Sequence, residues 1–334
     1  MKLLLEPLKA GNLSLKNRLV FPPIATSKAM DDGKVGRAIL DYYDEKTRSG
    51  LIGLTITEHS FISIQGKASR NQLSVGDESV IDGLRKLTET IHRNGSVAVA
   101  QINHSGSVAA REITGLDALA PSSIPNPRKP GKDVPRQLTK LEIGGIVSDF
   151  ASAARRVKEA GYDGVEIHSA HGFLLNQFFS PLTNQRSDEY GGKVENRFRI
   201  HLEIIAAVKK IVGNDFPILL RLGASDYREG GITIQNSELA AQAFEKAGVD
   251  ILDISGGLNG YTAPAGDEGP GYFAPLSCAI KQKVNIPVIL AGGVMRAEEA
   301  ERLLEERKAD LIGVGRAIRN DSDWAEKELA RTDI

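Results

Sequence analysis

Short apolar runs rich in β-branched residues alternate with longer segments of helical periodicity along the whole chain. Such runs are typical of parallel strands that are buried on both faces. The runs occupy residues 19–24, 51–57, 97–103, 164–168, 217–222, 251–255, 287–291 and 311–314. Eight strand–helix units without a break in composition predict an α/β fold, a closed (β/α)8 TIM barrel, rather than a doubly wound sheet. We expect a single domain over residues 1–334.

Helical segments are expected between the strand runs. An apolar stripe at helical spacing extends from Val80 to Ile91 and ends before Gly95, a residue type common just past a helix. Residues 143–160 and 237–247 contain the same kind of stripe. Each helix would return the chain to the start of the next parallel strand, as a barrel requires.

The charge balance and the cysteine count exclude several classes of protein. Lys plus Arg number 42 and Asp plus Glu 43, so the net charge of −1 gives no overall basic field for nucleic acid or anionic lipid. Cys278 is the only cysteine, which excludes an intrachain disulfide and any site with several cysteine ligands. The first leucines are soon followed by Glu6, and no apolar run reaches the length of a membrane span. We therefore expect a cytoplasmic protein without nucleic-acid or membrane partners.

Three connections that follow predicted strands are too long to be simple turns. They comprise residues 105–137, 172–196 and 256–275, and the first of them contains five prolines. Long loops in a compact domain usually carry function. All three would lie over the carboxyl-end face of the barrel, where such barrels place their active sites.

Polar side chains occur at the carboxyl ends of the strand runs. Four of the six histidines fall there: His59, His104, His168 and His171. Gln101 ends another run, and its amide offers donors and an acceptor that suit the edge of a heterocycle. The convergence of these groups on one rim predicts a site for a small molecule.

Arg221 stands alone on an otherwise apolar strand run. A buried guanidinium needs an anionic partner. Two alternatives are open: an ion pair with Asp226 or Glu166, or a cofactor that carries negative charge above the barrel.

Glycines end the last two strand runs. Gly292, Gly293 and Gly315 would let backbone N–H groups approach an anion closely, and Arg316 adds a fixed positive fork. Phosphate sites of such barrels lie after strands seven and eight, which is where these residues fall. The glycines therefore predict a phosphate-binding site, although they would also serve simply to turn the chain into the next helix.

His168 and His171 are also compatible with a divalent metal, because Glu166 lies on the same strand face as His168. This alternative would make the protein a metal-dependent barrel hydrolase or lyase. The pair lacks a third committed ligand, so we assign no metal. A Schiff-base aldolase is disfavoured because no lysine falls at the predicted strand ends.

A set of motifs follows in a fixed order along nearly the whole chain. The motifs are LKNR at 15–18 with PP at 22–23, HSAHGFLL at 168–175, FSP at 179–181, and DEYGG at 188–192 with ENR at 195–197. Gln101, Arg221, the glycine pair at 292–293 and the Gly-Arg pair at 315–316 complete the order. The chain thus resembles the Old Yellow Enzyme family of FMN-dependent NAD(P)H oxidoreductases, in its single-domain form.

The resemblance implies an FMN site at the barrel mouth. The implied cofactor-binding residues are Pro23, Ile24, Ala25, His59, Gln101, Arg221, Gly292, Gly293, Gly315 and Arg316. Of these, Gln101 would lie at the pyrimidine edge and Arg221 near N1 and O2, where a guanidinium stabilises negative charge. His168 and His171 would be the catalytic pair, which hydrogen-bonds an oxygen of the electron acceptor.

Three positions depart from the family pattern. Phe173 stands where relatives usually carry a tyrosine that donates a proton to the substrate, so ene reduction is in doubt. Tyr261, Tyr272 or water would have to replace that donor, and we assign these two tyrosines with Phe173 to the substrate pocket. Ala25 replaces a Thr or Cys, and His59 replaces a small residue.

The resemblance predicts an enzyme that takes electrons from NADH or NADPH. Reduced FMN would pass hydride to a small electron-poor acceptor: an enone, a quinone, a nitro compound or oxygen. The alternative within the same fold is a flavin-binding barrel without catalysis. A homo-oligomer is compatible with this prediction.

Overall fold

The computed structural model describes residues 2–128 and 134–330. Eight parallel strands close into a barrel in the order β3, β4, β5, β8, β9, β10, β11 and β12, and β12 pairs with β3. Their bounds are Leu19–Phe21, Leu54–Phe61, Val97–Asn103, Gly164–Ser169, Ile218–Gly223, Ile251–Ser255, Val288–Ala291 and Leu311–Gly313. The predicted TIM barrel is thereby confirmed.

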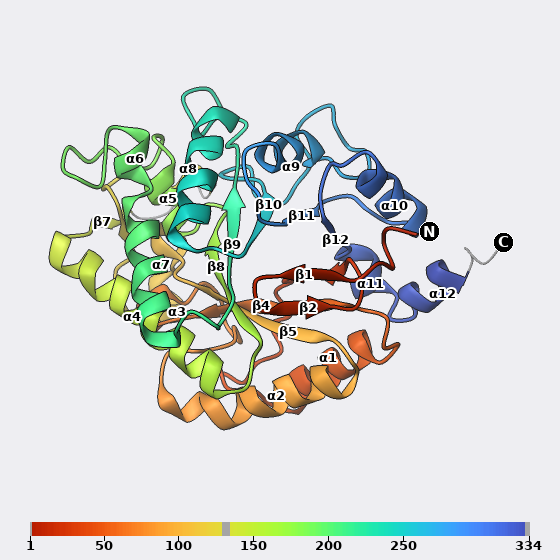
Figure 1. Ribbon diagram of the computed structural model, residues 1–334. Coiled ribbons are helices and arrows are strands. Elements are labelled where there is room, and N and C mark those ends of the chain that lie inside the picture. The colour runs from red at the N-terminus through yellow and green to blue at the C-terminus, as the bar shows by residue number, and fades with distance from the viewer. Residues whose placement is uncertain (1, 129–133, 331–334) are drawn as a thin grey trace.

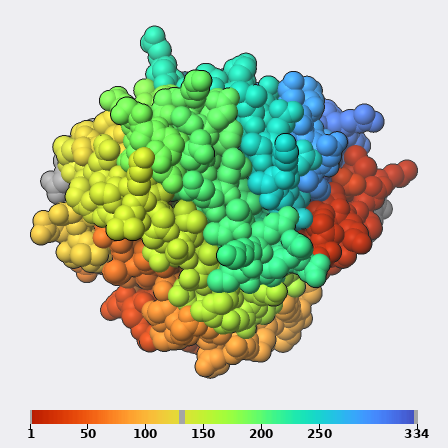
Figure 2. Space-filling view, turned by 60° about the vertical axis from the view of Figure 1, so that its left-hand side comes forward, coloured from red at the N-terminus to blue at the C-terminus, as the bar shows by residue number. Residues whose placement is uncertain are grey.

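Helices surround the barrel (Figure 1). The α-helices are α1 Arg37–Thr47, α2 Ile81–Arg93, α3 Arg111–Thr114, α4 Lys140–Glu159, α5 Leu174–Phe179, α6 Val194–Arg197, α7 Arg199–Val212, α8 Ile234–Ala247, α9 Ala274–Lys281, α10 Ala297–Glu305, α11 Arg316–Asn320 and α12 Trp324–Ala330. Short 3-10 helices are η1 Ile64–Gly66, η2 Glu78–Val80 and η3 Gly106–Val108. In the space-filling view, successive segments from yellow-green to teal lie side by side across the surface (Figure 2).

Two of the predicted strands differ from the observed ones by three or four residues at an end, and the other six agree to within one residue. The run 19–24 forms a strand only to Phe21, because the prolines at 22 and 23 have no N–H for the ladder. The run 51–57 pairs from Leu54 to Phe61, with an irregular register between Thr57 and Ser60. Such an irregularity changes the direction of the side chains at the end of the strand. His59 lies within this irregular part.

The floor of the barrel is closed by a hairpin that the strand pattern did not predict. Its strands are β1 Leu8–Ala10 and β2 Leu13–Leu15, which pair antiparallel. Their apolar side chains pack with inward-pointing residues of the barrel strands: Val20, Leu54, Ile56, Val99, Leu219, Ile251, Ile289 and Leu311. This apolar plug leaves only the carboxyl-end face open for a ligand.

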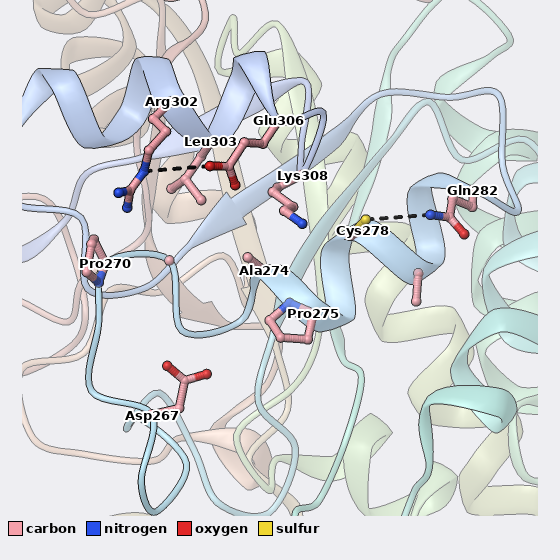
Figure 3. Close-up of a pocket in the computed structure, with 12 residues that line it drawn as sticks. Asp267, Pro270, Ala274, Pro275, Cys278, Gln282, Arg302, Leu303, Glu306 and Lys308 are labelled. Atoms are coloured by element: carbon pink, nitrogen blue, oxygen red, sulfur yellow. Dashed lines mark hydrogen bonds and ion pairs between the residues drawn. The ribbon is translucent and has the colours of Figure 1, made fainter.

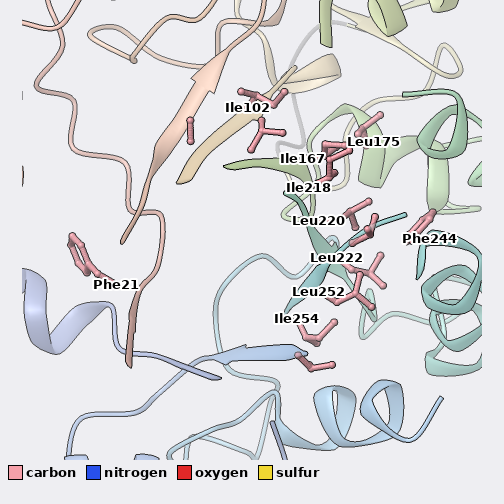
Figure 4. Close-up of a cluster of buried hydrophobic side chains, with 14 of the residues drawn as sticks. Phe21, Ile102, Ile167, Leu175, Ile218, Leu220, Leu222, Phe244, Leu252 and Ile254 are labelled. Carbon is pink, nitrogen blue, oxygen red and sulfur yellow. The ribbon is translucent and has the colours of Figure 1, made fainter. Parts of the chain in front are cut away.

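The outward-pointing strand residues form the larger core. Figure 4 shows Leu220 and Leu222 of β9 and Leu252 and Ile254 of β10 in this cluster, together with Phe244 of α8. Because successive strand residues alternate in direction, the same strands carry apolar side chains to the helices and, toward their carboxyl ends, polar ones to the barrel interior. This layer fixes the positions of the strand ends.

The helix ends follow the local sequence. α4 begins with a capping box of Thr139 and Glu142, and α8 with one of Thr233 and Asn236. The predicted helices 143–160 and 237–247 therefore start three residues earlier than their apolar stripes.

In the two described stretches of chain, no helix combines the length and the apolar character that a membrane crossing needs. The strands β6 Leu119–Ala120 and β7 Arg136–Gln137 form a small parallel pair separate from the barrel.

Candidate active site

A cavity of about 720 Å³ opens at the carboxyl ends of the barrel strands. It is lined by both predicted catalytic histidines, all ten predicted cofactor-binding residues and all three predicted pocket aromatics. The structure therefore brings together every residue that we assigned to the site from the sequence. His104 belonged to the predicted histidine rim but lies outside this lining, because its Nδ1 accepts a hydrogen bond from the Gly106 N–H (3.0 Å).

One wall of the cavity rests on a buried polar layer. Gln101 donates from Nε2 to Glu166 Oε2 at 2.6 Å, and Arg221 Nε lies 3.1 Å from Asp253 Oδ2. The contact between Arg221 and Asp253 is an ion pair but not a hydrogen bond. Neither of the two atoms has a hydrogen-bond partner among the described residues. Arg221 thus pairs with Asp253, and the prediction of Asp226 or Glu166 is wrong.

The neighbouring strands explain this partner. Arg221 and Asp253 are opposite each other in the register of β9 and β10, and both point into the barrel. Asp226 lies beyond the strand, where its carboxylate accepts from the Ser180 hydroxyl and from the Ile232 N–H. Strand register is a property of the closed sheet, so spacing along the chain did not reveal it.

The two buried carboxyls influence each other. Burial raises the pKa of Glu166, and the Asp253 charge raises it further, while Arg221 and Gln101 oppose the change. Burial also raises the pKa of Asp253 against the effect of Arg221. Since two acids share one guanidinium, the layer retains a proton to higher pH than solvated carboxyls would.

The histidine pair stands above this layer. The His168 and His171 ring centroids are 5.1 Å apart, and His171 Nε2 lies 2.7 Å from the Ser255 hydroxyl oxygen. His171 has φ +60°, a left-handed conformation that turns the chain at the end of β8. Burial lowers the pKa of both histidines well below the usual value, and nearby positive groups lower it further. Neutral imidazoles of this kind offer one N–H each to an acceptor atom.

Phe173 closes the cavity beside the histidines. Its ring centroid is 5.1 Å from His168 and 5.3 Å from His59. His59 is held by Gln72, whose Nε2 lies 2.8 Å from His59 Nδ1, and burial lowers the pKa of His59 to about 4. His59 is therefore a neutral, oriented side chain that narrows the pocket.

The glycine-rich end has the features of an anion site. Gly293 has φ +74°, and a Cβ there would lie 2.7 Å from the Gly269 carbonyl oxygen. The backbone N–H groups of Gly293 and Gly315 have no hydrogen-bond partner within the described stretches. Arg316 stands 5.9 Å from the Tyr272 ring centroid and has no carboxylate at ion-pair distance among those residues. Tyr272 donates its hydroxyl to the Tyr261 carbonyl (2.6 Å), and its ring lies against Gly292 and Gly293.

The segment between β3 and α1 forms an apolar wall. Pro23, Ile24 and Ala25 line the cavity, and the next residue, Thr26, is bound to Glu58 at the irregular part of β4. The Thr26 hydroxyl donates to Glu58 Oε1 at 2.5 Å, and its N–H donates to Oε2 at 3.2 Å. Burial raises the pKa of Glu58 to about 7. This carboxyl anchors the wall.

An apolar wall, a polar edge and an anion site at one end match the three parts of FMN: a planar ring system, a pyrimidine edge and a phosphate. The free N–H groups at Gly293 and Gly315 carry this fit, since such groups on glycine are typical phosphate donors. When bound, FMN supplies two-electron redox chemistry.

Sequence reasoning missed several lining residues. Ser255, Arg128 and Arg319 line the cavity but were not assigned to the site. Ser255 was visible as a strand-end polar residue, whereas Arg128 lies far from any strand end, in the loop between β5 and α4. Only the folded loop brings it to the barrel mouth.

A second cavity of about 590 Å³ lies on the outside, between α9 and α10 (Figure 3). Cys278 and Gln282 border it on one side and Arg302 and Glu306 on the other. None of the predicted site residues lines this groove. Within the part of the chain that the structure describes, no group of three or more His, Cys, Asp or Glu could hold a metal ion.

Comparisons with known proteins find similar chains and similar folds. The chain is 40% identical over 327 residues to an NADH oxidase of Thermoanaerobacter brockii, covering 96% of this chain and 49% of that protein. It is 36% identical over 335 residues to an NADPH dehydrogenase of a Geobacillus species, covering 99% and 95%. The old yellow enzyme homologue of Zymomonas mobilis has the same fold, with a TM-score of 0.85, 26% identity, and coverage of 98% and 93%.

The chain spans about half the length of two of the curated relatives that it matches, 49% in each case. Residues 3–331 match the NADH:flavin oxidoreductase / NADH oxidase family. Since this match extends over nearly the whole chain, the resemblance seen in the sequence is confirmed. The protein belongs to the NADH:flavin oxidoreductase / NADH oxidase family, the Old Yellow Enzyme family.

Proposed function

We propose that the protein is an FMN-dependent NAD(P)H oxidoreductase that passes hydride from reduced flavin to a small electron-poor acceptor. The observation that carries this proposal is the single cavity in which the glycine-rich anion site, the Gln101–Arg221 edge and the histidine pair meet. The relatives named NADH oxidase and NADPH dehydrogenase support a nicotinamide donor. Residues 1–334 would form one FMN-binding domain, with loops 105–137, 172–196 and 256–275 over the active-site face.

The cofactor is held by three kinds of group in this proposal. Gly292, Gly293, Gly315 and Arg316 bind the phosphate, and Pro23, Ile24 and Ala25 cover the ring. Gln101 reads the pyrimidine edge, and its hydrogen bond to Glu166 fixes the direction of its amide. Arg221 would place positive charge at the edge of the bound ring system, and Asp253 pairs with that guanidinium.

His168 and His171 bind the acceptor. The two ring centroids are 5.1 Å apart, so two neutral N–H donors can both hydrogen-bond one oxygen of a carbonyl, quinone or nitro group. Ser255 fixes the ring of His171 by its hydrogen bond. As negative charge develops on that oxygen, the two donors stabilise it without the reorganisation that water would require.

Proton delivery limits the acceptor range. Phe173 has no hydroxyl, and the Tyr272 hydroxyl is committed to the Tyr261 carbonyl. Tyr261 stacks edge-on over His171 at 5.9 Å and is 66% exposed, so solvent reaches this part of the pocket. Acceptors that need no proton at a defined carbon, namely quinones, nitro compounds and oxygen, therefore suit the site better than enones.

Anaerobic stopped-flow tests the proposal. The purified protein is reconstituted with FMN and mixed with NADH or NADPH while flavin absorbance is recorded. The reduced protein is then mixed with an enone, a nitro compound, a quinone or oxygen. Rapid bleaching by either nucleotide, followed by reoxidation, is the expected result. Absence of bleaching with both nucleotides would favour the alternative of a flavin-binding barrel without catalysis.

The setting of the reaction belongs to the same proposal. The partner is a small-molecule acceptor, and we place the protein in the cytoplasm. One cysteine and a net charge of −1 support a reducing compartment and a role without nucleic acid or membrane. A homo-oligomer is compatible with this role.

A further inference from the structure

The barrel mouth is unusually positive. Among the described residues, four arginines line the cavity and no Asp or Glu side chain does: the arginines are Arg128, Arg221, Arg316 and Arg319. Arg221 is compensated by Asp253 beneath it, and Arg316 and Arg319 lie at the glycine end that we assign to the phosphate. Arg128 remains as a cation on the acceptor side.

Hydrogen bonds from its side chain and its backbone hold Arg128 in place. Its guanidinium donates from Nη1 to the His171 carbonyl, and its backbone N–H donates to Asn126 Oδ1 at 2.9 Å. Asn126 in turn donates to the Gly172 carbonyl at 3.2 Å. The loop that carries the arginine is therefore attached to the turn that carries the catalytic histidine.

Two glycines make room for this side chain. A Cβ at Gly172 would lie 2.8 Å from Arg128 Cδ, and a Cβ at Gly260 would lie 2.6 Å from Nη2. Both glycines have positive φ, +72° and +79°. Two loops from different strands thus leave a channel whose occupant is the arginine.

The structure shows no counterion for Arg128 among the residues that it describes. Among residues 2–128 and 134–330, no carboxylate lies within ion-pair distance of its guanidinium. Burial lowers the pKa of Arg128, and the groups facing it are the Tyr261 hydroxyl and the like charge of Arg228. The positive charge of Arg128 also lowers the pKa of His168 and His171. The Arg128 side chain is exposed and lines the cavity, so its guanidinium is accessible to an anionic ligand.

We propose that Arg128 recognises an anionic group on the electron acceptor, and that the preferred acceptor is a small electron-poor carboxylate. Its reducible group contacts His168 and His171 while its carboxylate contacts Arg128. This inference rests on the proposed function for the identity of the site, and it adds the substrate class.

Equilibrium binding tests the inference without turnover. The probes are 4-nitrobenzoate and 4-nitrobenzamide, which share the ring and the nitro group and differ in charge. Each is titrated into the oxidised, FMN-loaded protein without nicotinamide, and the dissociation constant is read from the flavin absorbance. We expect tighter binding of the benzoate. Arg128→Gln should weaken it by about ten- to a hundredfold, as for loss of a charge-assisted hydrogen bond, and weaken the amide less than about threefold.

Controls separate recognition from loop disruption. Arg128→Lys keeps the positive charge but removes the paired N–H donors of the guanidinium, and it should give an intermediate affinity for the benzoate. Arg228→Gln removes a neighbouring positive charge at an exposed position outside the cavity and should leave both affinities nearly unchanged. Equal affinities of the two probes in the unmodified protein would overturn the inference. Equal losses of both probes in Arg128→Gln would overturn it too, because they would indicate that Arg128 only positions His171.

Failure of this inference is distinguishable from failure of the proposed function. If NADH and NADPH do not bleach the flavin but the benzoate still binds through Arg128, the anion site stands and the oxidoreductase proposal falls. If the flavin is bleached and reoxidised but the benzoate and the amide bind equally well, the oxidoreductase proposal stands and the proposed role of Arg128 falls.

Discussion

Glu58 links the stability of the protein to pH through the apolar wall of the cavity. The side chain is 1% exposed, and burial raises its pKa from 4.5 to about 7 against the hydrogen bonds from Thr26. Between these two pH values the folded protein keeps the proton and the unfolded chain releases it. The free energy of unfolding therefore falls as pH rises through this window.

The size of the effect follows from the shift. At about 1.4 kcal/mol for each pKa unit, the Glu58 contribution to the free energy of unfolding falls by about 3 kcal/mol between pH 4.5 and pH 7. Glu58→Gln places a neutral amide there at every pH. The Gln oxygen can still accept from the Thr26 hydroxyl, whereas the contact with the Thr26 N–H is lost, which adds an offset independent of pH.

Urea unfolding monitored by far-ultraviolet circular dichroism measures this effect. Curves are recorded from pH 4.5 to 8 at constant ionic strength and saturating FMN. The difference in unfolding free energy, Glu58→Gln minus the unmodified protein, should rise by about 3 kcal/mol over this range. Glu89→Gln, at an exposed position in α2, should give a flat difference. Parallel stability curves for Glu58→Gln and the unmodified protein would refute the reasoning.

Two further substitutions test the site. Arg221→Ala should weaken FMN binding by about ten- to a hundredfold, measured by flavin fluorescence titration, because it removes a charged hydrogen-bond donor from the pyrimidine edge. Unchanged FMN affinity together with an unchanged reduction rate would show that the assignment of Arg221 is wrong. Phe173→Tyr should raise the rate of flavin reoxidation by cyclohexenone by at least about tenfold, because it restores a proton donor beside His168. A rate equal to that of the unmodified protein would mean that another group already supplies the proton.

The sequence alone determined the fold and most of the site. Each barrel strand is an apolar run, because a parallel strand buried on both faces must be apolar on both. The carboxyl ends of such strands meet at one face of a barrel, so the functional residues next to them could be collected from the sequence. His168, His171, Gln101, Arg221 and the glycines all follow that rule, and all line one cavity.

The tertiary structure decided the partners of these residues. Arg221 pairs with Asp253 because barrel closure sets β9 and β10 in that register, while the nearer Asp226 is used by a loop. The β1–β2 hairpin closes the barrel floor although its strands are too short to give a periodic signal. His104 turns away from the cavity because the chain bends directly after β5.

Arg128 is the clearest example of a site residue that could not be predicted from the sequence. It lies in the proline-containing loop after β5, 43 residues from His171, and nothing in its local sequence marks it as part of the site. It reaches the histidine because Asn126 ties the loop to Gly172 and because two glycines leave space for its side chain. Periodicity along the chain reports which residues are buried and at which strand end they fall. Contacts between loops depend on how the closed barrel brings its strand ends together, and only the folded chain sets those distances.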